Sequence, residues 1–96
     1  MIKWIKEAVT IDDNVLKVYG YVLSSSYRTR AVKALQQENK TPTQIAKDSD
    51  IRISHISKVL KELKECGVVN CLNEQDRKNK IYTLTALGHE IANNLE

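Results

Sequence analysis

The stretch of residues 51–84, IRISHISKVLKELKECGVVNCLNEQDRKNKIYTL, decides the fold of this chain. Four of its apolar residues recur at i, i+3, i+4 and i+7, which predicts one buried stripe along a helix: Ile56, Val59, Leu60 and Leu63. Gly67 then supplies the left-handed residue that closes such a helix. We therefore predict a helix over about residues 54–66, followed by a β-hairpin with a long polar tip over residues 68–84.

The helix face opposite this stripe is mostly cationic and hydroxylic at its start. With 3.6 residues per turn it carries Ser54, Lys58 and Lys61, with His55 and Ser57 on its flanks. The tip of the predicted hairpin is also basic and holds three cationic residues: Arg77, Lys78 and Lys80. Such a helix and hairpin suit a DNA major groove together with the neighbouring phosphates or minor groove.

Two further helices are predicted near the start of the chain. The first begins after a cap on Asp12 or Asp13, has the apolar pattern Val15, Val18, Tyr19 and Val22, and ends near Leu23. The second covers about residues 27–37, and the three serines at 24–26 supply its N-cap. Its expected inner face is Tyr27, Ala31, Ala34 and Leu35. Its expected outer residues are Arg28, Arg30 and Lys33.

The next segment, Thr41-Pro42-Thr43-Gln44, is a capping box. Thr41 is the N-cap, Pro42 occupies the first helical position, and Gln44 follows three residues after the cap. This short third helix, with Ile45 and Ala46 inward, is expected to end near Lys47 or Asp48. A turn over residues 49–53 joins it to the helix that Ser54 is expected to cap, which makes a helix-turn-helix without the usual turn glycine. Thr85 is expected to cap a last helix that contains Leu87, Ile91 and Leu95.

The length of 96 residues predicts one domain with one core, mainly α with a small β-hairpin (α+β). The net charge of +3 is unevenly distributed. Residues 24–80 hold 12 Lys and Arg against 7 Asp and Glu, a local charge of +5, whereas residues 1–23 are neutral and residues 81–96 carry −2. The central segment is therefore the part expected to bind a polyanion.

Several classes of protein are not expected. No apolar run is long enough to span a membrane, and the first residues do not resemble a signal peptide. The two cysteines, Cys66 and Cys71, have no partners at zinc spacing, so we expect reduced thiols, no metal, no cofactor and a cytoplasmic location. No phosphate-binding glycine loop, nucleophile elbow or metalloprotease motif occurs, so we do not expect an enzyme.

The order of predicted elements, four helices, a hairpin and a helix, resembles the winged helix-turn-helix regulators of bacteria and archaea. Residues 76–88, DRKNKIYTLTALG, are similar to the wing of the MarR type, with an Asp-Arg tip, a closing strand and Leu-Thr-x-x-Gly opening the last helix. Residues 21–28, YVLSSSYR, resemble the start of the helix-turn-helix in small archaeal regulators of the ArsR/MarR kind. Residues 43–46 and 53–63 are similar to the positioning and recognition helices of both families.

The resemblance implies a transcriptional regulator, here expected to be a repressor, that binds double-stranded DNA as a homodimer. It implies that Arg77 reaches the minor groove or its phosphates, held in place by Asp76, and that residues 1–23 and 85–96 carry the dimer interface. The full set of expected DNA-binding residues is Thr43, Gln44, Arg52, Ser54, His55, Ser57, Lys58, Lys61, Arg77, Lys78 and Lys80. The ArsR metal-sensing Cys-x-Cys motif is absent, and the sequence names no small-molecule effector.

Two alternatives to a DNA-binding regulator stay open at the level of sequence. The first is a winged helix that binds only proteins, although its surface would more often show exposed apolar or aromatic residues. The second is a thiol-redox sensor acting through Cys66 and Cys71, which compete for this role with an ordinary semi-buried packing function. The aromatic residues Trp4 and Tyr19 or Tyr21 either build the dimer interface or pack within one subunit.

Overall fold

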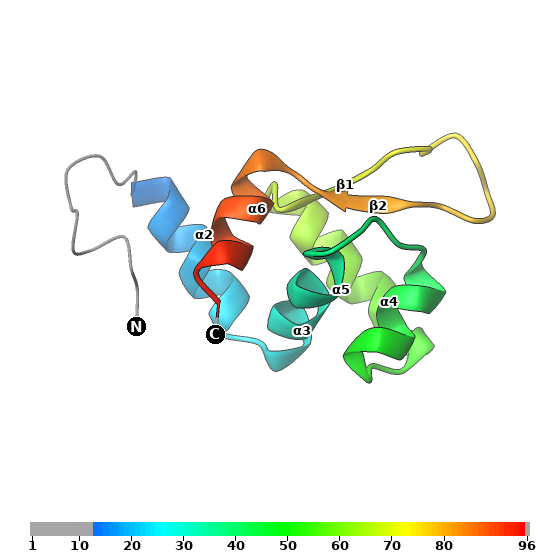
Figure 1. Cartoon of the computed structure of the whole chain (residues 1–96), viewed down its shortest axis with the longest axis horizontal. Helices are drawn as coiled ribbons and strands as arrows, with labels where there is room; N and C mark the ends of the chain where they lie inside the picture. Colours follow the sequence, from blue (N-terminus) through cyan, green and yellow to red (C-terminus); the bar gives the residue numbers. More distant parts are fainter. Residues whose placement is uncertain (1–12, 96) are drawn as a thin grey trace.

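The computed structural model describes residues 13–95 and has the predicted order of elements (Figure 1). In chain order they are α2 (Asp13–Leu23), α3 (Ser26–Leu35), α4 (Pro42–Ser49), α5 (Ile53–Glu65), β1 (Val69–Cys71), β2 (Tyr82–Leu84) and α6 (Ala86–Asn93). The fold is thus a winged helix-turn-helix, mainly helical, in which α4 and α5 form the helix-turn-helix and β1, β2 and their connecting loop form the wing. The expected cap at Asp12 and the aromatic residue Trp4 lie outside the described residues.

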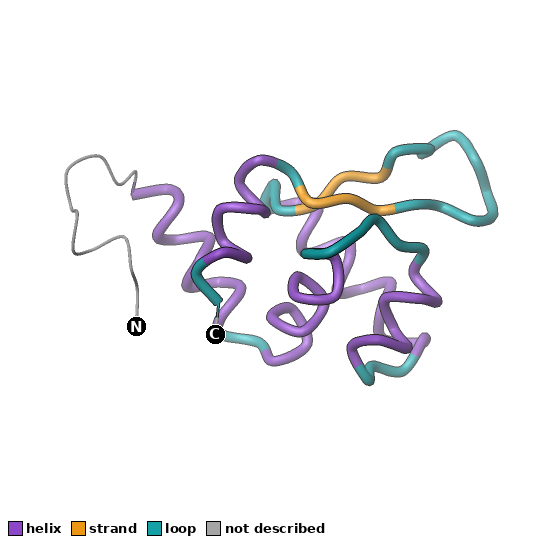
Figure 2. The backbone as a smooth tube through the Cα atoms, viewed as in Figure 1, coloured by secondary structure: helices purple, strands orange, loops and turns teal. Residues whose placement is uncertain are grey.

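Helices make up most of the described chain, and the hairpin extends from one side of them (Figure 2). β1 and β2 are antiparallel and pair Val69 with Leu84 and Cys71 with Tyr82. Figure 1 shows α2 and α6 together at one end, while the tip of the wing extends toward the other end, where α4 lies. Within residues 13–95 no helix is long and apolar enough to cross a membrane.

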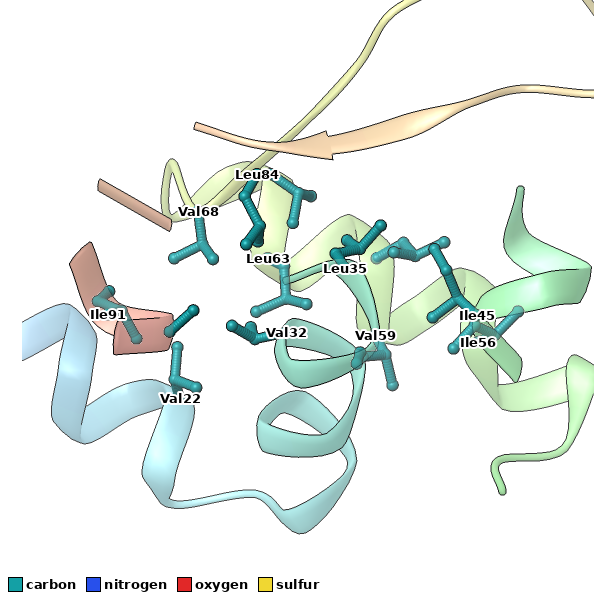
Figure 3. Packing of buried hydrophobic residues seen from close by; sticks show 14 of the residues in the cluster. Val22, Val32, Leu35, Ile45, Ile56, Val59, Leu63, Val68, Leu84 and Ile91 are labelled. Atoms are coloured by element: carbon teal, nitrogen blue, oxygen red, sulfur yellow. The ribbon is translucent and has the colours of Figure 1, made fainter. Parts of the chain in front are cut away.

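One core joins all these elements (Figure 3). The predicted stripe of α5 is buried throughout, with Leu63 lying between α3 and the base of the wing. Val22 of α2 faces Ile91 of α6, and Ile45 of α4 lies beside Ile56 of α5. Because α5 packs against α3, α4 and the wing, its outer face is held in one orientation relative to the rest of the domain.

The wing is tied to the start of α4 by the backbone. Lys40 N–H donates to the Tyr82 carbonyl at 3.2 Å, and Tyr82 N–H donates to the Lys40 carbonyl at 2.8 Å. The sequence does not predict this bridge, because a single bridging residue leaves no alternating pattern. This bridge places the second strand of the wing directly beside the capping box of the helix-turn-helix.

Three of the predicted helix caps are confirmed. Ser25 accepts from the backbone N–H of Arg28, the Thr41–Gln44 capping box is complete, and Thr85 accepts from Gly88 N–H at 3.0 Å. Ser54 as a cap is wrong: α5 begins at Ile53, and its N-cap is Arg52, which makes no side-chain capping bond. α4 runs to Ser49, past its predicted end, and the left-handed Asp50 (φ 56°) then reverses the chain in a turn short enough for α5 to begin at Ile53.

The inner face of α3 also differs from the prediction. Tyr27 is 37% exposed, and Val32, fully buried, takes the inward place beside Ala31 and Leu35. Arg28 was expected to point outward but is half-buried, since its guanidinium stacks 3.8 Å above the Tyr21 ring and bonds to residues of other elements. A flat guanidinium can combine such stacking with several hydrogen bonds, which the helical pattern does not reveal.

The Thr-x-x-Gly motif that opens α6 has a physical reason in this packing. A Cβ on Gly88 would lie 2.1 Å from the carbonyl oxygen of Val68, so no other residue fits at this position without a backbone shift. Thr85 completes the junction, because its hydroxyl donates to the Gly67 carbonyl at 2.6 Å and its N–H donates to the Val68 carbonyl. The motif therefore fixes α6 against the base of the wing.

We expect Gly88→Ala to lower the free energy of unfolding by about 3 kcal/mol, because the added methyl group meets a backbone carbonyl that cannot move independently. Gly20→Ala is the matched control, since a Cβ at this exposed position of α2 meets nothing within 4 Å. It should raise stability by about 0.5–1 kcal/mol through helix propensity. Urea unfolding followed by circular dichroism measures both, and equal effects of the two substitutions would contradict this account of the junction.

Candidate nucleic-acid interface

The structure places the predicted contact residues of α5 on one accessible surface. Ser54, Ser57, Lys58 and Lys61 are exposed on the face opposite the buried stripe, and His55 is exposed on its flank. Arg52 is exposed immediately before the helix. Because Ser54 does not cap α5, its hydroxyl is available to an external partner.

The turn that presents α5 is held by α3. The guanidinium of Arg30 donates to the carbonyls of Ser49 and Asp50 at 3.0 and 3.3 Å, and the Ser49 hydroxyl donates back to the Arg30 carbonyl. Ile51, in the middle of the turn, is buried. Asp50 stands where such turns usually have a glycine, since an aspartate tolerates the left-handed conformation better than most residues. The start of the recognition helix is thus anchored on two sides.

Two acidic residues close to this surface are neutralised by ion pairs. Glu62 of α5 pairs with Arg28 of α3 at 3.0 Å, where the side chains are only 25% and 13% exposed. Glu74 of the wing pairs with Lys64 of α5. Lys58 and Lys61 take part in no ion pair within residues 13–95, so their charges face outward uncompensated. The electrostatic potential of this face is therefore positive, although α5 itself holds two glutamates.

A polar hollow of about 520 Å³ connects the helix-turn-helix to the wing. It brings together four of the predicted residues, Thr43, Ser57, Arg77 and Lys80. The remaining lining comes from the capping box and the wing: Thr41, Pro42, Asn79 and Tyr82. Residues from the capping box, α5 and the wing, up to 41 positions apart in the sequence, thus share one surface. Its backbone amides, hydroxyls and cations are the groups that bind phosphate oxygens.

The role of Gln44 is partly internal. Its side-chain oxygen accepts from the Thr41 N–H at 3.0 Å and from the Thr41 hydroxyl at 3.3 Å. Gln44 is exposed, so only its amide nitrogen stays available to an external group. Thr43, exposed between these two capping residues, keeps its hydroxyl for such a partner.

Asn73 organises the tip of the wing, and the sequence did not single it out. Its side-chain oxygen accepts from Ile81 N–H at 2.7 Å, while its amide donates to the Asp76 carboxylate and the Asn79 carbonyl. The expected support of Arg77 by Asp76 is therefore replaced by an Asn73–Asp76 bond. Arg77 and Lys78 are exposed and make no ion pair within the described chain, while Lys80 is half-buried. An asparagine in a long hairpin tip could have predicted this role, since its side-chain amide can bond to the backbone across a loop.

An aromatic pair extends the surface toward α3. The rings of Tyr27 and His55 lie 5.9 Å apart at 46°, and the Arg30 guanidinium lies 5.1 Å above the Tyr27 ring. This arrangement explains why Tyr27 faces outward rather than into the core. His89, by contrast, is exposed on α6, at a distance in the chain from this surface.

Comparison with known proteins identifies the family to which the chain belongs. Residues 16–86 match the sequence profile described as the sugar-specific transcriptional regulator TrmB. The chain belongs to this family. No curated protein matches the chain. The predicted kinship with winged-helix regulators is thus confirmed, with TrmB as the family whose profile matches.

Three solved structures share the winged-helix fold of this TrmB-family chain. TubR bound to 24 bp of tubC from Bacillus thuringiensis serovar israelensis pBtoxis has a TM-score of 0.72 at 16% identity, covering 88% of this chain and 94% of TubR. The homodimeric domain of Mb0332 from Mycobacterium bovis, a possible ArsR-family regulator, has a TM-score of 0.64 at 19% identity, with 88% and 81% covered. The MarR family regulator SPO1453 from Silicibacter pomeroyi DSS-3 has a TM-score of 0.67 at 16% identity. That match covers 86% of this chain but only 62% of SPO1453, so the chain spans less than two thirds of that regulator's length.

The two cysteines of this TrmB-family chain are free thiols with separate partners. Cys66 donates to the Leu63 carbonyl at 3.4 Å, and Cys71 donates to the Asn73 side-chain oxygen at 3.6 Å. Burial raises the pKa of the Cys66 thiol above its ordinary value, and this outweighs the nearby Arg28 charge, which lowers it. Among residues 13–95 no three His, Cys, Asp or Glu side chains are grouped so that they could hold a metal ion.

We expect Cys66 to react with iodoacetamide at pH 8 more slowly in the folded chain than in urea. Its raised pKa lowers the thiolate fraction, and the thiolate is the nucleophile. Peptide mass spectrometry over time measures the modification at this residue. A faster reaction of Cys66 in the folded chain would mean an activated thiol and would favour the redox-sensor alternative.

Proposed function

We propose that this TrmB-family chain binds duplex DNA sequence-specifically as a homodimer and regulates transcription. The observation that carries the proposal is the continuous accessible surface formed by α5, the polar hollow and the wing. It combines uncompensated cations, hydroxyls and the ordered starts of two helices, which are the groups that proteins use toward DNA. The DNA in the TubR structure supports the proposal through the shared fold.

The residues divide into two roles in this proposal. Arg52, Ser54, Ser57 and Lys58, with His55 beside them, present donors from the first turns of α5 to base edges in the major groove. Phosphates are bound around them by the residues Thr43, Gln44, Lys61, Lys78 and Lys80. Arg77 extends the footprint from the wing into the minor groove or along its phosphates.

The homodimer is proposed to form at the end of the molecule away from the wing tip. There α2 and α6 pack together, and the Tyr19 hydroxyl donates to the Asn94 carbonyl at 3.1 Å. Tyr19 is buried within one subunit, so an interface would use the exposed residues Tyr21 and Leu23 rather than Tyr19. Two α5 helices about 34 Å apart would then meet a pseudo-palindromic site. The homodimer of Mb0332 supports this arrangement.

We further propose that the chain acts in the cytoplasm as a non-enzymatic repressor. A small domain on promoter DNA can lower transcription simply by occupying the site of the polymerase. If raised expression of the chain increased its target transcripts, the repressor part of the proposal would be wrong while DNA binding would stand.

The test is fluorescence anisotropy with duplex DNA from upstream of the chain's own gene and with random duplex, at several salt concentrations. We expect Lys58→Ala/Lys61→Ala to weaken binding and to make the salt dependence shallower by about 0.9 per protomer. Loss of the Lys61–phosphate contact leaves fewer counterions to release on binding, whereas loss of Lys58 removes contacts to base edges. The matched control is Lys33→Glu, at an exposed position of α3, which lowers the net charge equally, from +3 to +1.

The control should bind almost as the unmodified chain does. Equal losses in this control and in Lys58→Ala/Lys61→Ala would mean that only net charge matters and that α5 is not the contact surface. No binding to either duplex at low salt would overturn the proposed function and favour a protein-binding winged helix.

A further inference from the structure

We propose that Ile53 reads the 5-methyl group of a thymine in the major groove and thereby sets part of the sequence preference. This inference rests on the proposed DNA-binding function, which it makes more specific. Ile53 was not among the residues that the sequence pattern indicated for DNA contact. It is an apolar residue on a surface that is otherwise polar.

The exposure of Ile53 is not explained by packing. Three isoleucines lie at the start of the recognition helix, Ile51, Ile53 and Ile56, and their exposed fractions are 5%, 55% and 0%. The two outer ones fill the core around the turn and the helix. Ile53 does not pack into the core, although it lies between these two residues and follows the turn that Arg30 holds. The cost of leaving this side chain in water is removed only when another molecule covers it.

The position of Ile53 indicates what that molecule is. It is the first residue of α5, and its neighbours in the chain, Arg52 and Ser54, are both exposed. One turn further along the helix lies Ser57, which lines the polar hollow beside the wing. An apolar side chain framed by cations and hydroxyls at the start of a recognition helix suits a base edge better than an apolar protein partner.

The chemistry of the major groove offers one apolar group that varies with sequence. Thymine carries a methyl group at C5, whereas the other three bases present only donors, acceptors or a C–H at their edges. A branched aliphatic side chain can cover this methyl group and exclude water from both. Burial of one methyl group is worth about 0.8 kcal/mol, which corresponds to about a fourfold change in affinity.

The other exposed aliphatic residues lie elsewhere. Leu23 ends α2, and Leu72 and Ile81 lie in the wing, where Leu72 N–H donates to the Ile81 carbonyl at 2.8 Å. Ile81, at 37% exposure, therefore offers a control of the same residue type outside α5.

The experiment begins with selection of a tight-binding duplex from a random-sequence library by the full chain. Each thymine of that duplex is then replaced singly by deoxyuridine, which removes the 5-methyl group and keeps base pairing. We expect one replacement in each half-site to weaken binding of the unmodified chain about fourfold in an anisotropy competition assay. The Ile53→Ala variant should bind the thymine and deoxyuridine duplexes equally at that position.

The controls separate the possible outcomes. Ile81→Ala should keep the fourfold deoxyuridine effect, and circular dichroism should show that Ile53→Ala, altered at an exposed site, is folded. The inference is overturned if no single replacement weakens binding, or if Ile53→Ala keeps the same loss as the unmodified chain. If the library yields no enriched duplex, the proposed DNA-binding function itself has failed, which is a different result from a duplex that binds without a methyl effect.

Discussion

The two backbone hydrogen bonds between Lys40 and Tyr82 are the constraint on which the candidate interface depends. They join the second strand of the wing to the residue before the capping box, while the first strand follows directly from α5. The wing, α4 and α5 therefore form a closed arrangement in which each is positioned by the other two. Backbone geometry thus places the second strand of the wing beside α4, whereas the shape of the wing tip, which carries Arg77, depends on the side-chain bonds of Asn73.

Within this arrangement, ion pairs determine the sign of the charge on the candidate interface. Arg28 and Lys64 neutralise the glutamates nearest the recognition helix, while Lys58, Lys61 and Arg77 stay uncompensated. The Arg28–Glu62 pair also links α3 to α5 in a partly buried setting, where a guanidinium can stack and bond at once. A modest net charge of +3 is thus compatible with an excess of positive charge on this face, because Glu62 and Glu74 are paired while Lys58 and Lys61 make no ion pair within the described chain.

Local signals in the sequence predicted much of the fold. The capping box, Gly67 as the helix-closing residue (φ 86°) and the cap at Thr85 were all placed correctly, because each depends on bonds within a few residues. The prediction failed at Ser54 and Tyr27, where neighbouring elements decide the outcome. The left-handed Asp50 shifts the start of α5, and the stacking of Arg30 and His55 keeps Tyr27 at the surface.

The sequence by itself determined the order of elements, the buried stripe of α5 and the identity of the cationic residues, since helical period and capping chemistry are local properties. Only the tertiary structure decided which residues share a surface. The bridge at Lys40, the bonds of Asn73 in the wing tip, the gathering of Thr43, Ser57 and Arg77 around one hollow, and the exposure of Ile53 all arise between segments distant in the chain or from the space left by packing. Such contacts leave no periodic trace, because they depend on where whole elements lie relative to one another.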